Sequence, residues 1–286
     1  MDKEIWHSLL HRAAETNKYD YGHVLVIGGS EALVGAPVLA ARSALRTGAG
    51  LVTIASTADV VALIDRDIEE VMTLSLPNWD QTKQLVAALK SFAADRHVSV
   101  IIMGPGLPAA ADEAIRALLE HIHLPMVLDA ECFTALSGNL PALQAAATSN
   151  SSLVLTPHSG EYARLLQGQD SLGNASETDS AAQFTRYYHV TLVLKRHHTL
   201  VAGADGAVHQ NTTGNPGLAT AGAGDVLTGI IAGLLAQNIE PFTAARMAVQ
   251  LHGLAADAAA QSKTEPGLIA SDVIESIPAA LHMLDR

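Results

Sequence analysis

The sequence is poor in cysteine, in aromatic residues and in charged residues. Its 286 residues include one cysteine, Cys132, so no disulfide can form within the chain, which is typical of a reducing compartment. Aromatic residues make up 4% and charged residues 16%, whereas apolar residues reach 49%. This composition argues against a disordered chain and predicts a core of Ala, Val, Leu and Ile.

Positive charge and long apolar runs are also scarce. Lys and Arg number 17 against 29 Asp and Glu, a formal net charge of −12, so we expect no nucleic-acid partner. A small anionic ligand is not excluded, because a few backbone amides can hold one. No apolar run approaches the roughly 18 residues of a membrane span, and Met1–Glu4 does not resemble the start of a signal peptide. We therefore expect a soluble cytoplasmic protein without a membrane partner.

Short β-branched segments alternate with Ala- and Leu-rich segments of helical spacing. The predicted strands, several of them apolar throughout as in a buried parallel sheet, are His23–Ile27, Leu51–Ala55, Val98–Met103, Met126–Asp129, Leu153–Thr156, Thr191–Lys195 and Leu200–Ala202. The predicted helices are Pro37–Thr47, Thr82–Ala94, Ala111–His121, Gly160–Leu166, Ser176–Tyr188, Asp225–Gln237, Thr243–Ala260 and Ala270–Met283. This alternation predicts right-handed βαβ units and a mainly parallel sheet covered by helices.

The chain shows no internal repeat and no Pro- or Ser-rich linker. Asp170–Ser176 is polar but short enough for a loop. We therefore predict a single α/β domain over residues 1–286. Near its start, Ile5–Leu10 is apolar at helical spacing and is expected to cover this domain or a neighbouring subunit.

Gly-rich segments occur where strands are predicted to end. Gly28-Gly29-Ser30 follows the first strand, Gly35-Ala36-Pro37 opens the next helix, and Gly104-Pro105-Gly106 follows a later strand. Ligands of α/β sheets bind at such strand ends. The spacing matches neither the dinucleotide fingerprint nor the phosphate loop, and tight turns would also explain these segments.

A fourth Gly-rich segment, Gly214–Gly229, has a more specific pattern. Gly222-Ala223-Gly224 carries almost no side chains and leads into an apolar helix that is expected to begin near Asp225. The free amides and the dipole at such a helix start favour an anion, so this turn is a candidate anion hole for a transferring phosphoryl group. Asp225 either caps the helix or accepts a proton from a substrate hydroxyl, and the Gly run before it favours the second role.

Five further positions carry polar chemistry. His158 follows a strand end and is either a surface residue at a helix entry or a ligand contact, and Asp129 is equally suited to capping a helix or holding a ligand or a magnesium-bound water. His252 is expected to be buried and hydrogen-bonded in an Ala-rich helix. His197 and His198 would point to opposite faces of a strand, which excludes shared metal chelation. We therefore predict no resident metal site in the chain.

These residues together resemble a known enzyme family. Gly222-Ala223-Gly224-Asp225 is similar to the anion hole and catalytic base of ribokinase-like kinases. The other matching segments are Gly28-Gly29-Ser30, Gly35-Ala36, Gly104-Pro105-Gly106, Thr156-Pro157-His158-Ser159-Gly160-Glu161, Gly214-Asn215-Pro216-Gly217 and Leu251-His252-Gly253. In combination, from about Lys18 to Ile277, they resemble the ADP/ATP-dependent NAD(P)H-hydrate dehydratases. The resemblance implies a ribokinase-like three-layer α/β/α fold.

The resemblance also implies an activity. Such enzymes return the S epimer of NADH or NADPH hydrated at C6 (NADHX, NADPHX) to NADH or NADPH. In bacterial members ADP generally phosphorylates the C6 hydroxyl, giving AMP, and phosphate is then eliminated. Magnesium and a homotetramer are implied as well. A ribokinase-like kinase that phosphorylates a vitamin or sugar alcohol is the alternative.

The family motifs assign roles to residues of this chain. Ala36, Gly106, His158 and Asp225 would line the hydrated dinucleotide, and Gly224 would contact the adenine nucleotide. A Lys-Gly-x-x-Thr segment of the family, which also lies at the nucleotide, aligns with Lys195, Arg196, His197, His198 and Thr199. Arg196 replaces the usual Gly in this segment.

Overall fold

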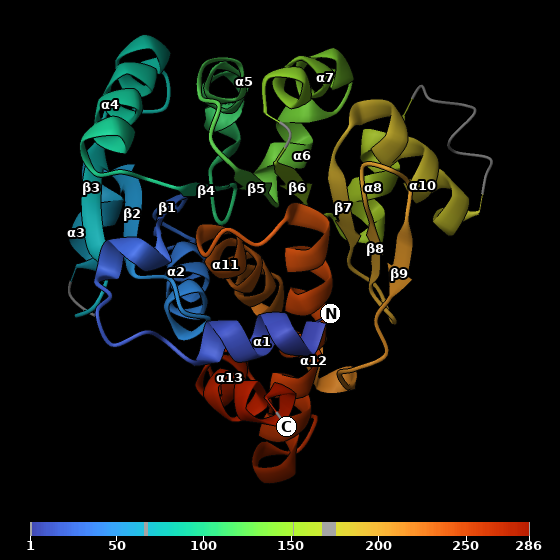
Figure 1. Ribbon diagram of the computed structural model, residues 1–286. Coiled ribbons are helices and arrows are strands. Elements are labelled where there is room, and N and C mark those ends of the chain that lie inside the picture. Colours follow the sequence, from blue (N-terminus) through green and yellow to red (C-terminus); the bar gives the residue numbers. More distant parts are fainter. Residues whose placement is uncertain (1, 66–67, 151, 168–175, 286) are drawn as a thin grey trace.

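A nine-stranded sheet forms the centre of the computed structural model, which describes residues 2–65, 68–150, 152–167 and 176–285 (Figure 1). In spatial order the strands are β3 (Met72–Leu76), β2 (Leu51–Thr57), β1 (His23–Ile27), β4 (Val100–Met103), β5 (Met126–Leu128), β6 (Leu153–Leu155), β7 (Thr191–Leu194), β8 (Leu200–Ala202) and β9 (Val208–Gln210). The strands from β3 to β7 are parallel, whereas β7, β8 and β9 pair antiparallel.

Helices cover both faces of this sheet (Figure 1). One layer contains α2 (Gly35–Arg46), α3 (Ala58–Ile64), α11 (Ala223–Ala236), α12 (Pro241–Lys263) and α13 (Ala270–Leu284), and α1 (Asp2–Leu10) packs against α13. The other layer contains α4 (Thr82–Asp95), α5 (Asp112–His121), α6 (Glu131–Leu136), α7 (Leu140–Ser149), α8 (Ser159–Leu165) and α10 (Glu177–Tyr188). Successive side chains of a strand point to opposite faces, so each strand contributes to an apolar core on both sides of the sheet. In β1, Val24 and Val26 belong to the first core, and Leu25 and Ile27 belong to the second.

The three-layer α/β/α prediction is therefore confirmed, and each predicted strand and helix is present with its ends shifted by a few residues. The sequence reading missed β3, β9, α3, α6 and α7. β3 and β9 lie at the two edges of the sheet and are partly exposed, so they lack the apolar runs of the central strands. The predicted loop at Asp170–Ser176 lies outside the described residues except for Ser176, which caps α10.

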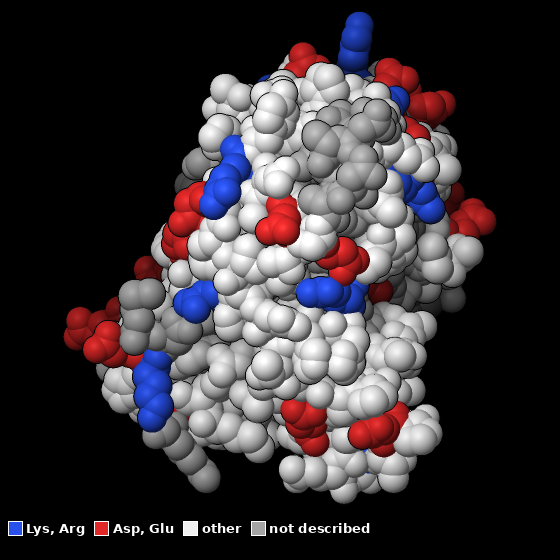
Figure 2. All heavy atoms as spheres, turned by 90° about the vertical axis from the view of Figure 1, so that its right-hand side faces the viewer, with Lys and Arg blue, Asp and Glu red and all other residues white. Residues whose placement is uncertain are grey.

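Among the residues that the structure describes, basic side chains form no continuous patch on the face of the molecule shown in Figure 2, as expected from the low content of Lys and Arg. In Figure 2, which shows the side of β9, α8 and α10, lysine and arginine side chains are separated by acidic and uncharged ones.

Within the described part of the chain, no helix is both long enough and apolar enough to cross a membrane. Trp6 of α1 is 2% exposed and packs into the first core, so the apolar face of α1 covers its own chain.

The close contact between α11 and α2 depends on glycine. A Cβ atom at Gly229 would lie 2.0 Å from the Ser43 Oγ and 2.1 Å from the Ala40 carbonyl oxygen, so any side chain there forces the helices apart. We expect Gly229→Ala to lower the free energy of unfolding by about 1–3 kcal/mol, measured by urea denaturation. Gly35→Ala is the control, because its Cβ would meet nothing within 4 Å. Equal losses in the two variants would contradict the close-packing explanation.

Candidate functional site

The chain reverses its direction of sheet growth between β1 and β4. After β1 it proceeds to β2 and β3 on one side, and it then returns to add β4 on the other side of β1. The loops that follow β1 and β4 meet at this switch point, where the Gly29 amide donates to the Pro105 carbonyl over 2.9 Å. Gly106 has a φ of 70°, and a Cβ there would lie 3.3 Å from the Ala36 Cβ. The structure therefore brings Ala36 and Gly106 together where α/β sheets bind ligands.

The N-terminus of α11 is open. Gly222 occupies the N-cap position with a φ of 86° and no side-chain cap, and a Cβ there would lie 2.4 Å from Leu39. Within the described residues, the amides of Gly224 and Asp225 donate to no backbone or side-chain acceptor that the structure records. The helix begins at Ala223 rather than at Asp225, so the capping alternative for Asp225 is wrong. Two free amides at a helix start provide a site for an anion.

A buried ion pair lies beside this helix start. Asp129, directly after β5, accepts hydrogen bonds from the Lys195 Nζ at 2.7 Å and from the Thr228 Oγ1 of α11 at 2.9 Å. The Asp129 side chain is only 3% exposed. A Cβ on Gly224 would lie 3.2 Å from the Lys195 Nζ, so this ammonium lies next to the free amides. The Asp129 carboxylate therefore holds Lys195 in place and does not cap the next helix.

The ion pair sets the charge states of the site. Burial and, to a smaller extent, the nearby Asp129 carboxylate raise the pKa of Asp225, Lys195 opposes them, and the net result is a pKa of about 7. Burial alone would lower the pKa of Lys195, but the adjacent Asp129 carboxylate outweighs it and the net shift is upward. Lys195 therefore remains an ammonium, whereas Asp225 can take up and release a proton near neutral pH.

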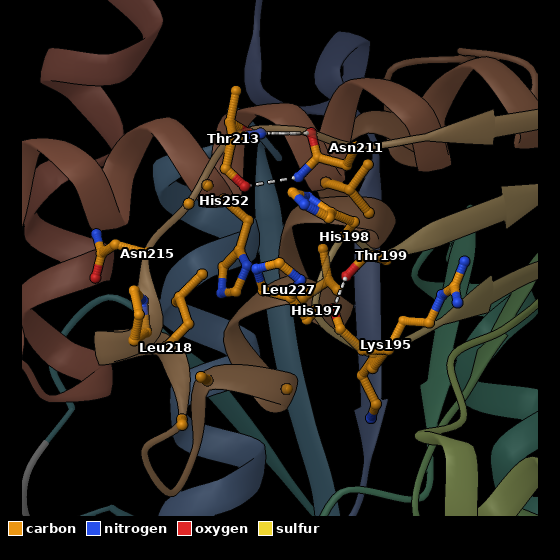
Figure 3. A pocket seen from close by; sticks show the side chains of 18 of the residues that line it. Lys195, His197, His198, Thr199, Asn211, Thr213, Asn215, Leu218, Leu227 and His252 are labelled. Atoms are coloured by element: carbon orange, nitrogen blue, oxygen red, sulfur yellow. Dashed lines mark hydrogen bonds between the residues drawn. The ribbon is translucent and has the colours of Figure 1, made fainter.

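A cavity of about 650 Å³ opens beside Lys195 and Gly224 (Figure 3). It lies among the β7–β8 connection, the segment before α11, and α12. Its walls include these predicted site residues: His158, Lys195, Arg196, His197, His198, Thr199, Ala223 and Gly224. Asp225, Ala36, Gly106 and Gly222 are not among the lining residues. The structure thus separates a nucleotide-sized cavity from the Ala36–Gly106 region, and α11 begins between them.

The reasoning about His197 and His198 was wrong. The pair lies in a bend between β7 and β8, not on a strand, and His198 has a φ of 57°. Their ring centroids are 4.0 Å apart, and both rings line the cavity (Figure 3). Adjacent side chains can share one direction in a bend, whereas a strand would separate them. Beside them, the Arg196 Nη1 pairs with Glu177 Oε2 at 2.8 Å, at the start of α10.

His252 is buried in α12, as predicted, and lies on the cavity wall close to His197 (Figure 3). Burial lowers its pKa to about 4, against the opposing effect of a hydrogen bond to the Ala223 backbone. The ring is therefore neutral at physiological pH. Its Nε2 is buried and has no hydrogen-bond partner among the described residues. One ring nitrogen thus contacts the start of α11, and the other has unused hydrogen-bonding capacity.

Two supporting residues were missed by the sequence reading. Asp257 of α12 accepts a hydrogen bond from the Gly214 amide at 3.0 Å and from the Asn215 Nδ2 at 2.9 Å, which holds the Gly-rich segment against α12. Thr228, one turn after Asp225, donates to Asp129. The signal for Asp257 was a lone carboxylate in the Ala-rich stretch Leu254–Ala260. The pairing partner was not evident from spacing.

His158 is the N-cap of α8. Its Nδ1 accepts hydrogen bonds from the amides of Gly160 at 3.0 Å and Glu161 at 3.2 Å, and the Glu161 carboxylate accepts one from the His158 amide. This is a capping box, so the helix-entry alternative is correct for the Nδ1 side of the ring. The ring also lines the cavity, and its side chain is 57% exposed. His158 thus caps the helix through Nδ1, while its Nε2 lies 3.5 Å from the Glu161 Oε1 and the rest of the ring faces the cavity.

Two substitutions of His158 test whether it only caps α8 or also contacts a ligand. We expect His158→Ala to lower the free energy of unfolding by about 1 kcal/mol, because the cap is lost, and His158→Asn to retain most of the stability. If the exposed part of the ring contacts the substrate, both variants raise its KM. Urea denaturation and steady-state kinetics on the same preparations separate the two roles. An unchanged KM in both variants would limit His158 to capping.

Comparisons with known proteins agree with one another. A family model described as NAD(P)H-hydrate dehydratase matches residues 24–279. The chain is 40% identical over 284 residues to a bifunctional NAD(P)H-hydrate repair enzyme of Moorella thermoacetica, covering 96% of this chain and 52% of that protein. It thus spans about half the length of the curated bifunctional relatives that it matches.

A curated relative of similar length and a solved structure complete the comparison. The ADP-dependent (S)-NAD(P)H-hydrate dehydratase of Neisseria meningitidis is 35% identical over 280 residues, covering 96% of this chain and 89% of that protein. The structure of the ADP/ATP-dependent NAD(P)H-hydrate dehydratase of Bacillus subtilis, co-crystallised with ATP and Mg²⁺, superposes with a TM-score of 0.76. Its identity is 28%, with 99% of this chain and 97% of that chain covered.

Proposed function

Because the chain belongs to the NAD(P)H-hydrate dehydratase family, we propose that it is an ADP-dependent dehydratase, a lyase that repairs hydrated NADH and NADPH. Its substrate is the S epimer of NADHX or NADPHX, and ADP is converted to AMP and phosphate. The observation that carries the proposal is Asp225. This carboxyl group, with a pKa raised to about 7, lies in the first turn of α11 beside the free helix start and close enough to Asp129 and Lys195 to respond to their charges.

The residues divide the substrates between two regions. The hydrated nicotinamide lies near Ala36, Gly106 and Asp225, because the switch point offers two small residues that let a ring approach the backbone. His158, which the resemblance assigns to the same substrate, contacts it from the wall of the cavity. The adenine nucleotide occupies the 650 Å³ cavity along the segment from Lys195 to Thr199, and its terminal phosphate points at Gly224. Gly222, Ala223 and Gly224 form the anion hole between the two substrates.

The chemistry replaces the leaving group at C6: phosphorylation of the hydroxyl allows phosphate to leave instead of hydroxide, which is a poor leaving group. The Asp225 carboxylate takes the proton of the C6 hydroxyl as that oxygen bonds to the β-phosphorus of ADP, and the bond from that phosphorus to the bridging oxygen breaks to release AMP. The amides of Gly224 and Asp225, together with the Lys195 ammonium, stabilise the negative charge on the moving phosphoryl group. The ring nitrogen then expels phosphate from C6, and loss of a C5 proton restores the dihydropyridine.

Magnesium is proposed to arrive with the nucleotide. The Asp129 carboxylate is committed to Lys195 and Thr228, and the described residues place no group of three metal-binding side chains at this site. This donor set suits a cation held chiefly by phosphate oxygens and water. When bound there, Mg²⁺ neutralises charge on the phosphates during transfer.

We also propose that residues 1–286 form one domain, that the protein assembles as a homotetramer, and that it acts in the cytoplasm. Light scattering on the purified protein tests the assembly. A monomer at working concentration would contradict it.

The activity itself is tested by absorbance at 340 nm. Purified protein is mixed with hydrated NADH and magnesium, with ADP or ATP in parallel reactions. We expect a rise with the S epimer and ADP, and none with the R epimer, which is the matched control. No rise with either nucleotide, from protein shown to be folded, would overturn the proposal. A stable phosphorylated product formed from a vitamin or sugar alcohol would then identify the kinase alternative.

A further inference from the structure

Three metal-binding side chains meet far from the nucleotide cavity. His7 of α1 and His11, just after α1, both contact Asp285, which directly follows α13. The His7 Nδ1 lies 3.1 Å from the Asp285 Oδ1, and the His11 Nε2 lies 3.2 Å from the Asp285 Oδ2. The group combines two imidazoles and a carboxylate from segments 274 and more residues apart. We call it the His7–His11–Asp285 cluster.

The spacing of the cluster fits a small tetrahedral ion. Zinc binds imidazole nitrogen and carboxylate oxygen at about 2.0–2.1 Å, so two ligand atoms in a tetrahedron lie about 3.3 Å apart. The nitrogen–oxygen separations, 3.1 Å from His7 to Oδ1 and 3.2 Å from His11 to Oδ2 of Asp285, are close to this value, so the carboxylate presents one oxygen to each imidazole. All three ligand atoms lie within 4.8 Å of one another. The histidines are four positions apart, a spacing that places both rings on one side of a helical turn, and their ring centroids are 4.1 Å apart.

The charge of the cluster favours a cation. Asp285 places a carboxylate group within hydrogen-bond distance of both imidazoles. Each imidazole must present a proton to that carboxylate in the metal-free protein, and a single divalent ion replaces both protons. The formal net charge of −12 raises the local concentration of cations around the whole molecule.

We propose that His7, His11 and Asp285 bind one divalent transition-metal ion, with zinc as the best match, and that water completes the tetrahedron. The ion joins α1 to the end of α13. The other end of α13 begins at Ala270, next to Gly222, so this helix of 15 residues separates the ion from the anion hole by roughly 20 Å. At that distance the ion stabilises the packing of α1 and takes no part in the reaction.

The test is calorimetric titration of tag-free protein with zinc chloride, without nucleotide. We expect one ion per chain with a micromolar Kd, and an upward shift of Tm with added zinc. The double variant His7→Gln/His11→Gln, and separately Asp285→Asn, should bind at least about tenfold more weakly while keeping the metal-free Tm near that of the wild type. Turnover with ADP should be unchanged in the double variant.

A matched control uses His282, an exposed histidine in the last turn of α13. His282→Gln should bind zinc as the wild type does, because His282 is outside the cluster. Cobalt provides a second readout, since tetrahedral Co²⁺ with nitrogen ligands absorbs strongly in the visible range and the octahedral aqueous ion does not. The proposal would be overturned if the double variant bound zinc as tightly as the wild type. It would also be overturned if the wild type bound no zinc at a concentration about 100-fold above the expected micromolar Kd. Loss of binding in His197→Gln/His198→Gln, with the cluster intact, would do the same.

Discussion

Turnover should fall by about 10²–10⁴-fold when Asp225 is replaced by asparagine, because this removes the carboxylate that we propose takes the proton from the C6 hydroxyl. The amide is nearly the same size, so the anion hole and the cavity keep their shapes. The change therefore appears in kcat, and the Kd of ADP changes little. Single-turnover rates at 340 nm and calorimetric titration with ADP measure the two quantities. Asp80→Asn, an exposed position far from the motif segments, is the matched control.

The pH dependence follows from the raised pKa of Asp225. The base acts when ionised, so kcat/KM of the wild type should fall as the pH drops through about 7. The effect on stability has the opposite sign to that of an ordinary salt-bridged carboxylate. Folding favours the protonated form, so this group weakens the folded state progressively as the pH rises from about 4 to about 7, and above that range its destabilising effect is fully developed and constant. Asp225→Asn should thus resist urea better than the wild type at pH 8. A less stable variant with low turnover would mean that Asp225 has a structural role.

Removal of Lys195 should produce the largest loss of stability. The Asp129 side chain is 3% exposed and accepts a 2.7 Å hydrogen bond from Lys195, so Lys195→Met leaves a buried carboxylate without its cation. We expect the free energy of unfolding to fall by about 3–5 kcal/mol, measured by urea denaturation at pH 8. Lys90→Met, an exposed position on α4, should change it by less than about 0.5 kcal/mol.

The double variant Lys195→Met/Asp129→Asn completes the comparison. It removes both charges, so it should recover part of the stability that Lys195→Met loses. A double variant no more stable than Lys195→Met would show that the loss does not come from the unpaired carboxylate. Because Lys195 also lowers the pKa of Asp225, any residual activity of Lys195→Met should require a higher pH. Asp129→Asn removes the neighbouring negative charge and acts on Asp225 in the opposite direction.

The fold was predictable from the sequence because the central strands and most helices have distinct patterns. Val100–Met103 is apolar throughout, as a strand buried on both faces must be, and its ends shifted by only two residues. Val208–Gln210 has no such pattern, since an edge strand is partly solvated. The start of α11 was placed two residues late because Asp225 is a common capping residue, whereas the actual cap is Gly222.

The candidate site was only partly predictable because its contacts depend on the order of the strands. Asp129 was recognised as a polar residue at a strand end and Lys195 through the resemblance to the family, but the two are 66 positions apart and their pairing was not predicted. They meet because β5 and β7 are separated only by β6 in the sheet. The error at His197 and His198 has a local cause. The chain leaves the strand at Leu194 and bends, and a left-handed φ at a histidine has no sequence signature.

The position of α11 between two binding regions has a kinetic consequence. Gly222 faces Leu39 on the α2 side, whereas Gly224 faces Lys195 on the side of the cavity. The two ligands can therefore approach the same helix start from opposite directions, and neither must leave before the other enters. Such an arrangement favours a ternary complex with direct transfer over a ping-pong scheme through a phosphorylated enzyme. Initial-rate lines measured at several fixed concentrations of the second substrate should intersect rather than run parallel.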